Sequence, residues 1–130
     1  MIITKNINTK KHYDLVKKMK PHVSIVAGFS QIFQKKVLQI PKLGTINLHA
    51  GKLPNYRGGS PLNWQLINGE DKIGLSAILM DEGIDTGNIL SETEFPITDQ
   101  DDINSLHEKS NSLFDKIKGA KSFFSPSIVS

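Results

Sequence analysis

Two polar side chains near the middle of the chain, an amide and an imidazole, have a spacing that could bring them into one reactive site. Asn47 and His49 lie two residues apart in the apolar run 45–50, which is predicted to be a β-strand. Side chains two residues apart in a strand leave the same face of a sheet, so the amide and the imidazole would point into one cleft. A structural role, in which each group only satisfies the backbone of a nearby loop, is the competing interpretation.

Asp85 is a candidate partner for this pair. It lies in the loop DEGIDTG between two glycines, where the backbone can approach a ligand closely. A carboxylate at this position could orient the His49 imidazole or relay a proton through water. Asp81 and Glu82 lie in the same loop and could serve instead, because spacing alone does not choose among the three carboxylates.

Other chemistries fit the sequence less well. The chain has no cysteine, which excludes disulfides, thiolate nucleophiles and cysteine-ligated zinc. His49 has no second histidine at metal-ligand spacing, so we expect no metal site. No serine stands in the Gly-x-Ser-x-Gly turn of hydrolases. Acyl transfer without a protein nucleophile remains open.

Composition is that of an ordinary globular domain. Of 130 residues, 38% are hydrophobic and 22% are charged, and the length suits a single domain. The net charge of +3 weakly favours an anionic partner, although the lysines in the segment 10–20 are expected to form a solvated helix face. The start lacks the apolar segment of a secretory signal, and no run of about 18 apolar residues occurs. We therefore expect a cytoplasmic protein without a membrane partner.

Periodicity and breakers predict alternating helices and strands. Helices are expected at 10–20, around 34–38, from Ser60 to about Asn68, and at about 102–118. Strands are expected at 23–28, 45–50 and 73–80, with a fourth at 88–97 that could return antiparallel. The tail 120–130 has no assignable pattern. This order predicts the α/β class.

The helix after Ser60 is expected to be capped by that serine hydroxyl and to have Pro61 in its first turn. Trp64, together with Leu62 or Ile67, should pack against the sheet, with full burial of the indole as the expected state. The preceding loop would then hold its residues Asn55 and Arg57 near the cleft.

Beyond these patterns, INLHAGKLPNYRGGSPLNWQLINGE and GLSAILMDEGIDTGNIL closely resemble the formyltransferase family, which includes methionyl-tRNA, glycinamide ribonucleotide and sugar N-formyltransferases. The earlier run PHVSIVAGFSQIF is similar to the strand and loop that line the family's folate pocket. The resemblance spans roughly residues 20–94. It implies a partial Rossmann-like formyltransferase fold, with a mostly parallel sheet and an antiparallel edge hairpin.

The resemblance also assigns roles to residues. It implies that Asn47, His49 and Asp85 are catalytic and that 10-formyltetrahydrofolate is the formyl donor, without a metal. The donor-binding residues that it implies are Val26, Ala27, Gly28, Phe29, Gln31, Met80, Asp81, Glu82, Gly83 and Ile84. The substrate-binding residues are Lys52, Tyr56, Arg57 and Gly58.

The acceptor is expected to be a small-molecule amine. The run GKLPNYRG and the helix that carries Trp64 resemble the sugar enzymes more than the others, so a nucleotide-linked amino sugar is favoured. Formylation of methionyl-tRNA is the alternative within the class, and a catalytically silent binding module is the alternative outside it. Family members normally begin with a further strand–helix–strand unit. We therefore expect residues 1–130 to form one N-terminally truncated domain, whose open sheet edge invites a complementing segment or a second copy.

Overall fold

A computed structural model describes residues 6, 8–27, 32–118 and 127–129. Its elements are α1 (Lys10–Met19), β1 (Val23–Ala27), α2 (Lys35–Leu38), β2 (Thr45–His49), α3 (Pro61–Ile67), β3 (Lys72–Leu79), β4 (Ile89–Pro96), α4 (Ile103–Lys118) and β5 (Ser127–Val129). The predicted α/β class is confirmed, and most predicted boundaries agree with the observed ones to within two residues.

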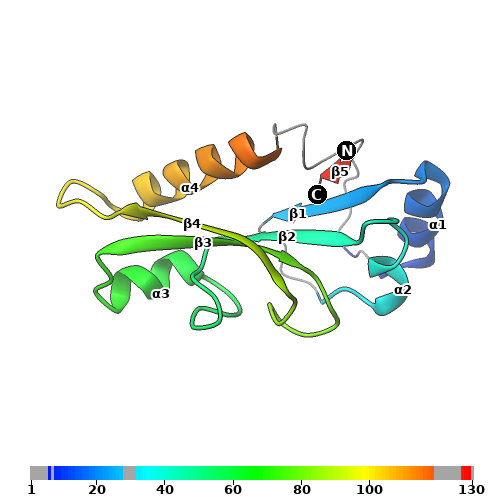
Figure 1. Cartoon of the computed structure of the whole chain (residues 1–130), viewed down its shortest axis with the longest axis horizontal. Helices are drawn as coiled ribbons and strands as arrows, with labels where there is room; N and C mark the ends of the chain where they lie inside the picture. Colours follow the sequence, from blue (N-terminus) through cyan, green and yellow to red (C-terminus); the bar gives the residue numbers. More distant parts are fainter. Residues whose placement is uncertain (1–5, 7, 28–31, 119–126, 130) are drawn as a thin grey trace.

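The strands of the described residues form one sheet in the order β4-β3-β2-β1-β5 (Figure 1). β1 pairs parallel with both β2 and β5, whereas β3 pairs antiparallel with both β2 and β4. The sheet is therefore parallel on one side and ends in the predicted antiparallel hairpin on the other. β2 is the central strand, with Asn47 opposite Val26 of β1 and Ile78 of β3.

Two hydrophobic clusters cover the two faces of the sheet. The larger contains residues of β1, β2, β3, α3 and α4, with Ile25, Leu48, Leu62, Ile73, Leu75, Ala77, Leu106 and Phe114 buried. The smaller joins Val26 of β1 to Phe33 and to Val37 and Leu38 of α2, with Tyr13 of α1 packed against it. Because neighbouring strand residues face opposite sides, Leu48 points to the larger cluster and Asn47 and His49 point to the other face.

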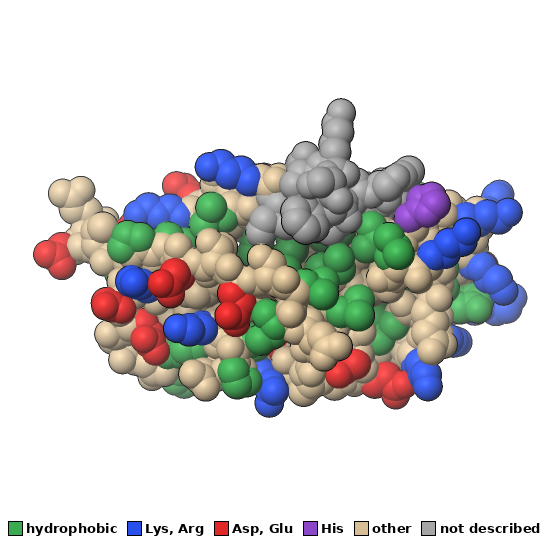
Figure 2. All heavy atoms as spheres, in the orientation of Figure 1, with side chains coloured by type: hydrophobic (Ala, Val, Ile, Leu, Met, Phe, Trp, Pro, Cys, Tyr) green, Lys and Arg blue, Asp and Glu red, His purple; other side chains and the backbone are tan. Residues whose placement is uncertain are grey.

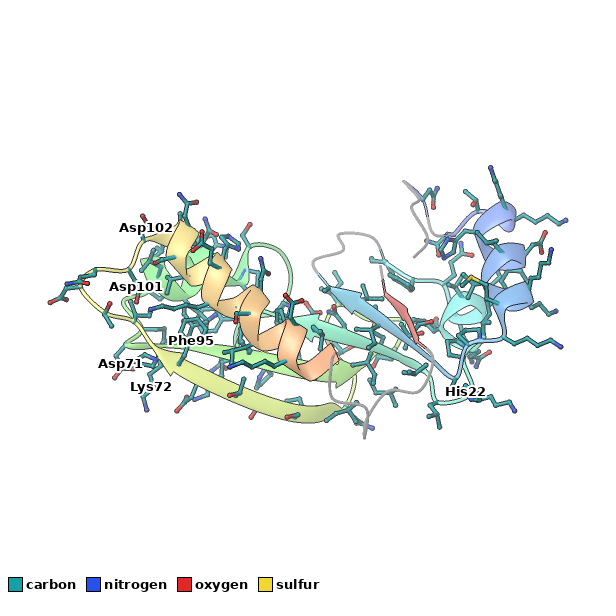
Figure 3. All side chains as sticks on the ribbon, turned by 90° about the horizontal axis from the view of Figure 1, so that it is seen from above. His22, Asp71, Lys72, Phe95, Asp101 and Asp102 are labelled. Atoms are coloured by element: carbon teal, nitrogen blue, oxygen red, sulfur yellow. The ribbon has the colours of Figure 1, made fainter. Side chains whose placement is uncertain are left out.

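α1 and α4 are amphipathic helices with well-defined starts. The Thr9 hydroxyl accepts a hydrogen bond from the His12 amide at the start of α1. The lysines of α1 are exposed and gather at one end of the molecule, at the right in Figure 2, which confirms the predicted solvated face. At the start of α4, Asp102 (labelled in Figure 3) and Ser105 exchange backbone-to-side-chain hydrogen bonds. None of the described helices is long and apolar enough to cross a membrane.

Two local predictions are wrong, and the tail that the sequence left unassigned contributes a strand. Ser60 has a left-handed backbone (φ 53°) and its hydroxyl makes no capping bond, so Pro61 begins α3 without a side-chain cap. Trp64 is 53% exposed and Ile67 is 67% exposed, whereas Leu62 alone of the three packs into the core. The tail contributes β5, a strand too short to leave a period-2 pattern in the sequence.

Candidate active site

The three predicted catalytic side chains meet at the carboxyl end of β2. Asn47 Nδ2 donates to Asp85 Oδ1 over 3.1 Å, and His49 Nδ1 lies 3.6 Å from Asp85 Oδ2. The second distance exceeds a direct hydrogen bond but permits an ion pair with a protonated imidazole. Both side chains of the His49–Asp85 pair are nearly buried, so solvent screens their interaction weakly.

Asp85 is held in place from several directions. Its backbone is left-handed (φ 52°), a conformation that aspartate adopts more readily than most residues. Oδ2 accepts a hydrogen bond of 2.8 Å from the Gly58 amide, and its backbone carbonyl accepts one of 3.3 Å from Arg57 Nε. The carboxylate therefore connects β2 to the loop 50–60.

His49 is surrounded by acceptors. Its Nε2 donates to the backbone carbonyl of Tyr56, and its Nδ1 faces the Asp85 carboxylate. Gly51 closes the same space, because a Cβ atom there would lie 2.8 Å from both His49 Nε2 and the Tyr56 carbonyl oxygen. The imidazole is therefore held between the Tyr56 carbonyl and the Asp85 carboxylate.

The structure separates Asp85 from the other carboxylates of its loop. Asp81 Oδ1 accepts hydrogen bonds from the Gly83 amide and the Thr86 hydroxyl, and these bonds, that of Thr86 first, lower the pKa of Asp81. Glu82 is exposed. Neither carboxylate contacts His49, so geometry selects the candidate that the sequence left open.

The loop 81–86 is anchored at its base. Met80 N donates to Thr45 O, and Leu79 N donates to Asn88 O. A Cβ atom at Gly87 would lie 1.6 Å from the Leu79 carbonyl oxygen, so only glycine fits there. Of the two glycines that flank the predicted loop, Gly87 is thus required for a close backbone approach.

The predicted donor-binding residues fall into three groups. Val26 is buried in the smaller cluster, against which Met80 packs, so the two predicted segments are adjacent. Ala27 is half-buried at the end of β1, and the loop residues Asp81, Glu82, Gly83 and Ile84 are exposed. Gly28, Phe29 and Gln31 lie outside the described residues.

The predicted substrate-binding residues do not all lie together. Arg57 and Gly58 contact Asp85, as described above. Lys52 instead lines a shallow hollow beside β3 and β4, together with Gly74 and Glu94, and away from Asn47. Tyr56 spans both places, because its carbonyl contacts His49 while its ring lines the hollow.

Sequence reasoning missed three polar residues that position the loop 50–60. The buried Gln65 amide donates to Ala50 O and accepts from Gly74 N. The Ser76 hydroxyl donates to Gly51 O, and the Glu70 carboxylate accepts from the Tyr56 hydroxyl. Of these three residues, only Gln65, a polar residue within a short predicted helix, gives a sign of such a role in the sequence, and that sign is weak. Among the described residues, no group of three or more His, Cys, Asp or Glu side chains could hold a metal ion.

Comparison with known proteins adds family information to this geometry. A family model described as "Formyl transferase" matches residues 4–117. The methionyl-tRNA formyltransferase of Clostridioides difficile (strain 630) is 45% identical over 100 residues, which is 77% of this chain and 32% of that protein. The chain spans about a third of the length of such curated relatives (32% and 34% in two of them).

Solved structures share the fold. A sugar N-formyltransferase from Shewanella sp. FDAARGOS_354 superposes with a TM-score of 0.71 and 25% identity, over 95% of this chain and 51% of that one. A phosphoribosylglycinamide formyltransferase from Bacillus halodurans superposes with a TM-score of 0.69 and 21% identity, over 82% of this chain and 57% of that one.

Proposed function

Because this chain belongs to the formyl transferase family, we propose that Asn47, His49 and Asp85 form the reacting centre of an N-formyltransferase. The observation that carries the proposal is the meeting of these three side chains at the end of the central strand. An amide donor, an imidazole and a carboxylate in contact are the groups that formyl transfer to an amine requires.

The proposed donor is 10-formyltetrahydrofolate, which supplies an activated formyl group when bound. The described part of the chain suits a flat heterocycle between the end of β1 and the loop 81–86. Met80 packs against the cluster that contains Val26, and the exposed Ile84 offers an apolar surface on the loop. These residues would hold the donor with its formyl group towards Asn47.

The residues of the chain then act on the acceptor amine and on the developing charge. The Asn47 amide keeps a second proton beside the one that it donates to Asp85, and His49 Nδ1 makes no direct hydrogen bond to that carboxylate. Both groups would face the oxyanion that forms as the amine attacks and would stabilise it. Asp85 would hold the imidazole in place and take up the ammonium proton through water. This proton would then pass to the donor nitrogen, which leaves as its bond to the formyl carbon breaks.

The acceptor class is proposed from the relatives. The names of the curated relatives favour the α-amino group of methionyl-tRNA, at 45% identity for the protein from C. difficile. The nucleotide-linked amino sugar expected from the sequence keeps the support of the Shewanella structure, which superposes over 95% of the chain at 25% identity. The comparisons do not favour the sugar over the tRNA, so both acceptors belong in one experiment.

The experiment measures formyl transfer from 10-formyltetrahydrofolate to methionyl-tRNA and to a nucleotide-linked amino sugar. Transfer to either one, lowered on the order of a hundredfold by His49→Ala, is the expected result for loss of a charge-stabilising donor. His107→Ala is the matched control, because His107 is an exposed histidine of α4. Donor binding measured by calorimetry should be the same in both variants.

A catalytically silent binding module gives a different result. In that case the chain would bind the folate, but neither acceptor would be formylated even when a complementing N-terminal segment of a relative is added. Transfer that is unaffected by His49→Ala would also contradict the proposed centre. Transfer only with the added segment would support it, since the residues named here would then need only an acceptor held in position.

A further inference from the structure

Tyr56 makes contacts with both sides of the loop that covers His49. Its backbone carbonyl accepts from His49 Nε2, and its backbone amide donates to Lys52 O over 3.1 Å. Its hydroxyl donates to the Glu70 carboxylate and accepts from Asn68 Nδ2. The loop is therefore tied to β2 through the Tyr56 backbone and to the end of α3 through the Tyr56 side chain.

From this geometry we infer that Tyr56 is a positioning residue for His49, anchored by Glu70, and that its side chain fixes the carbonyl that holds the imidazole. The inference rests on the proposed function for its kinetic part only. It changes the role expected of Tyr56 from substrate binding to support of a neighbouring side chain.

The side chain of Tyr56 is held in two ways. The phenol donates its proton to a carboxylate, which makes a stronger hydrogen bond than one between neutral groups. The same bond raises the pKa of the Tyr56 hydroxyl, which keeps the donor protonated. Since the phenol cannot move without breaking this bond, the backbone carbonyl on the other side of the residue keeps its direction.

The space around the carbonyl leaves little room for alternatives. A Cβ atom at Gly51 would lie 2.8 Å from His49 Nε2, from the Tyr56 carbonyl oxygen and from Pro61 Cβ. The imidazole thus lies between Asp85 on its Nδ1 side and this tight contact on its Nε2 side. A shift of the carbonyl would leave Nε2–H without its partner and let the ring turn about its Cβ–Cγ bond.

The test uses variants that alter the anchor and leave the Tyr56 backbone intact. Tyr56→Phe removes the hydroxyl, and Glu70→Ala removes its acceptor. Glu70→Gln retains an acceptor oxygen and is the expected rescue. Ser112→Ala is the control for the hydroxyl and Glu108→Ala is the control for the carboxylate, because both residues are exposed on α4.

Two readouts are needed, and the first does not depend on activity. Nitrogen-15 chemical shifts of the His49 ring report its protonation and hydrogen bonding. They should change in Tyr56→Phe and Glu70→Ala and stay near wild type in Glu70→Gln and both controls. The second readout uses whichever preparation transfers formyl groups, the chain alone or with the added N-terminal segment. There, the kcat of Tyr56→Phe and Glu70→Ala should fall on the order of tenfold while KM for the donor stays within about twofold.

Unchanged His49 ring shifts in both Tyr56→Phe and Glu70→Ala would overturn the inference. A fall in kcat with unchanged ring shifts would overturn it too, because Tyr56 would then act by another route. If the ring shifts change as expected but the wild-type chain transfers no formyl group to any acceptor, the positioning role stands and the proposed function fails.

Discussion

At the scale of single residues, the contacts of the site converge on one carboxylate. Asp85 accepts from Asn47 through one oxygen and from the Gly58 amide through the other, which also faces His49. The sequence predicted the Asn47–His49 pair from strand alternation, but it could not choose Asp85 over Asp81 without the family resemblance. The choice depends on which carboxylate is already hydrogen-bonded within the loop, as Asp81 is to Gly83 and Thr86. The spacing of residues in the sequence does not show this.

The Asp85→Asn variant tests this convergence. An amide has a single acceptor oxygen, so it cannot accept from both Asn47 and Gly58 and has no charge for His49. We expect kcat to fall on the order of a hundredfold with little change in donor affinity. Asp99→Asn, at an exposed position before α4, is the control. A loss of donor affinity equal to the loss of kcat would instead indicate collapse of the loop 81–86.

His12 gives the folded chain an acid-sensitive side chain. It is 6% exposed, its Nδ1 has no hydrogen-bond partner among the described atoms, and burial lowers its pKa from 6.5. Below pH 6.5 the unfolded chain therefore binds a proton that the folded chain resists, so the free energy of unfolding should fall as the pH drops. Urea titrations at pH 7.5 and 5.5 should show this fall.

The control variants for His12 separate burial from general acid sensitivity. His12→Leu should reduce the difference in the free energy of unfolding between the two pH values. The same change at the exposed His107 should leave that difference as it is in the wild type. Equal pH dependence in the wild type and His12→Leu would show that the imidazole is accessible to protons in the fold.

At the scale of elements, the sequence of a helix as short as α3 does not show which of its faces is buried. It has seven residues, about two turns, so several residue sets could form its buried face. The buried residues are Leu62 and Gln65, at i and i+3, and Trp64 faces outward. The longer α1 shows a helical period and the inner strands are short apolar runs, so both could be recognised from the sequence.

The energetic consequence for α3 can be measured directly. Leu62→Ala should lower the free energy of unfolding by about 2–5 kcal/mol, as expected for a buried leucine. Trp64→Ala should lower it by less than about 1 kcal/mol because the indole is mostly exposed. Chemical denaturation of the two variants checks both values. A larger loss for Trp64→Ala than for Leu62→Ala would contradict the observed orientation of the helix.

At the scale of the whole molecule, the sheet has an exposed edge at β4. Nearly every residue of this strand is exposed, and it ends the strand order. Glu92 and Glu94 place like charges along it, which opposes pairing with a second copy of the strand. Repulsion between these charges thus opposes the pairing with a second copy that an open edge suggests. Pairing at β4 stays a prediction.

Removing these charges should reveal the pairing tendency. The double variant Glu92→Thr, Glu94→Thr keeps strand propensity and should raise the proportion of dimer in sedimentation velocity at low salt. Glu108→Thr, at an exposed position of α4, should leave the proportion unchanged. An equal increase in both variants would indicate a general effect of net charge.

The central position of β2 implies a difference in local stability within the site. Asn47 and His49 stand on a strand paired on both sides, whereas the loop of Asp85 is joined to the sheet by backbone hydrogen bonds at its base and by the Asp85 side chain. Amide hydrogens of β2 should exchange only through global opening, and those of residues 82–86 through small fluctuations. In rising urea, Asp85 should therefore leave His49 before the fold is lost, and formyl transfer should disappear ahead of the circular dichroism of the sheet.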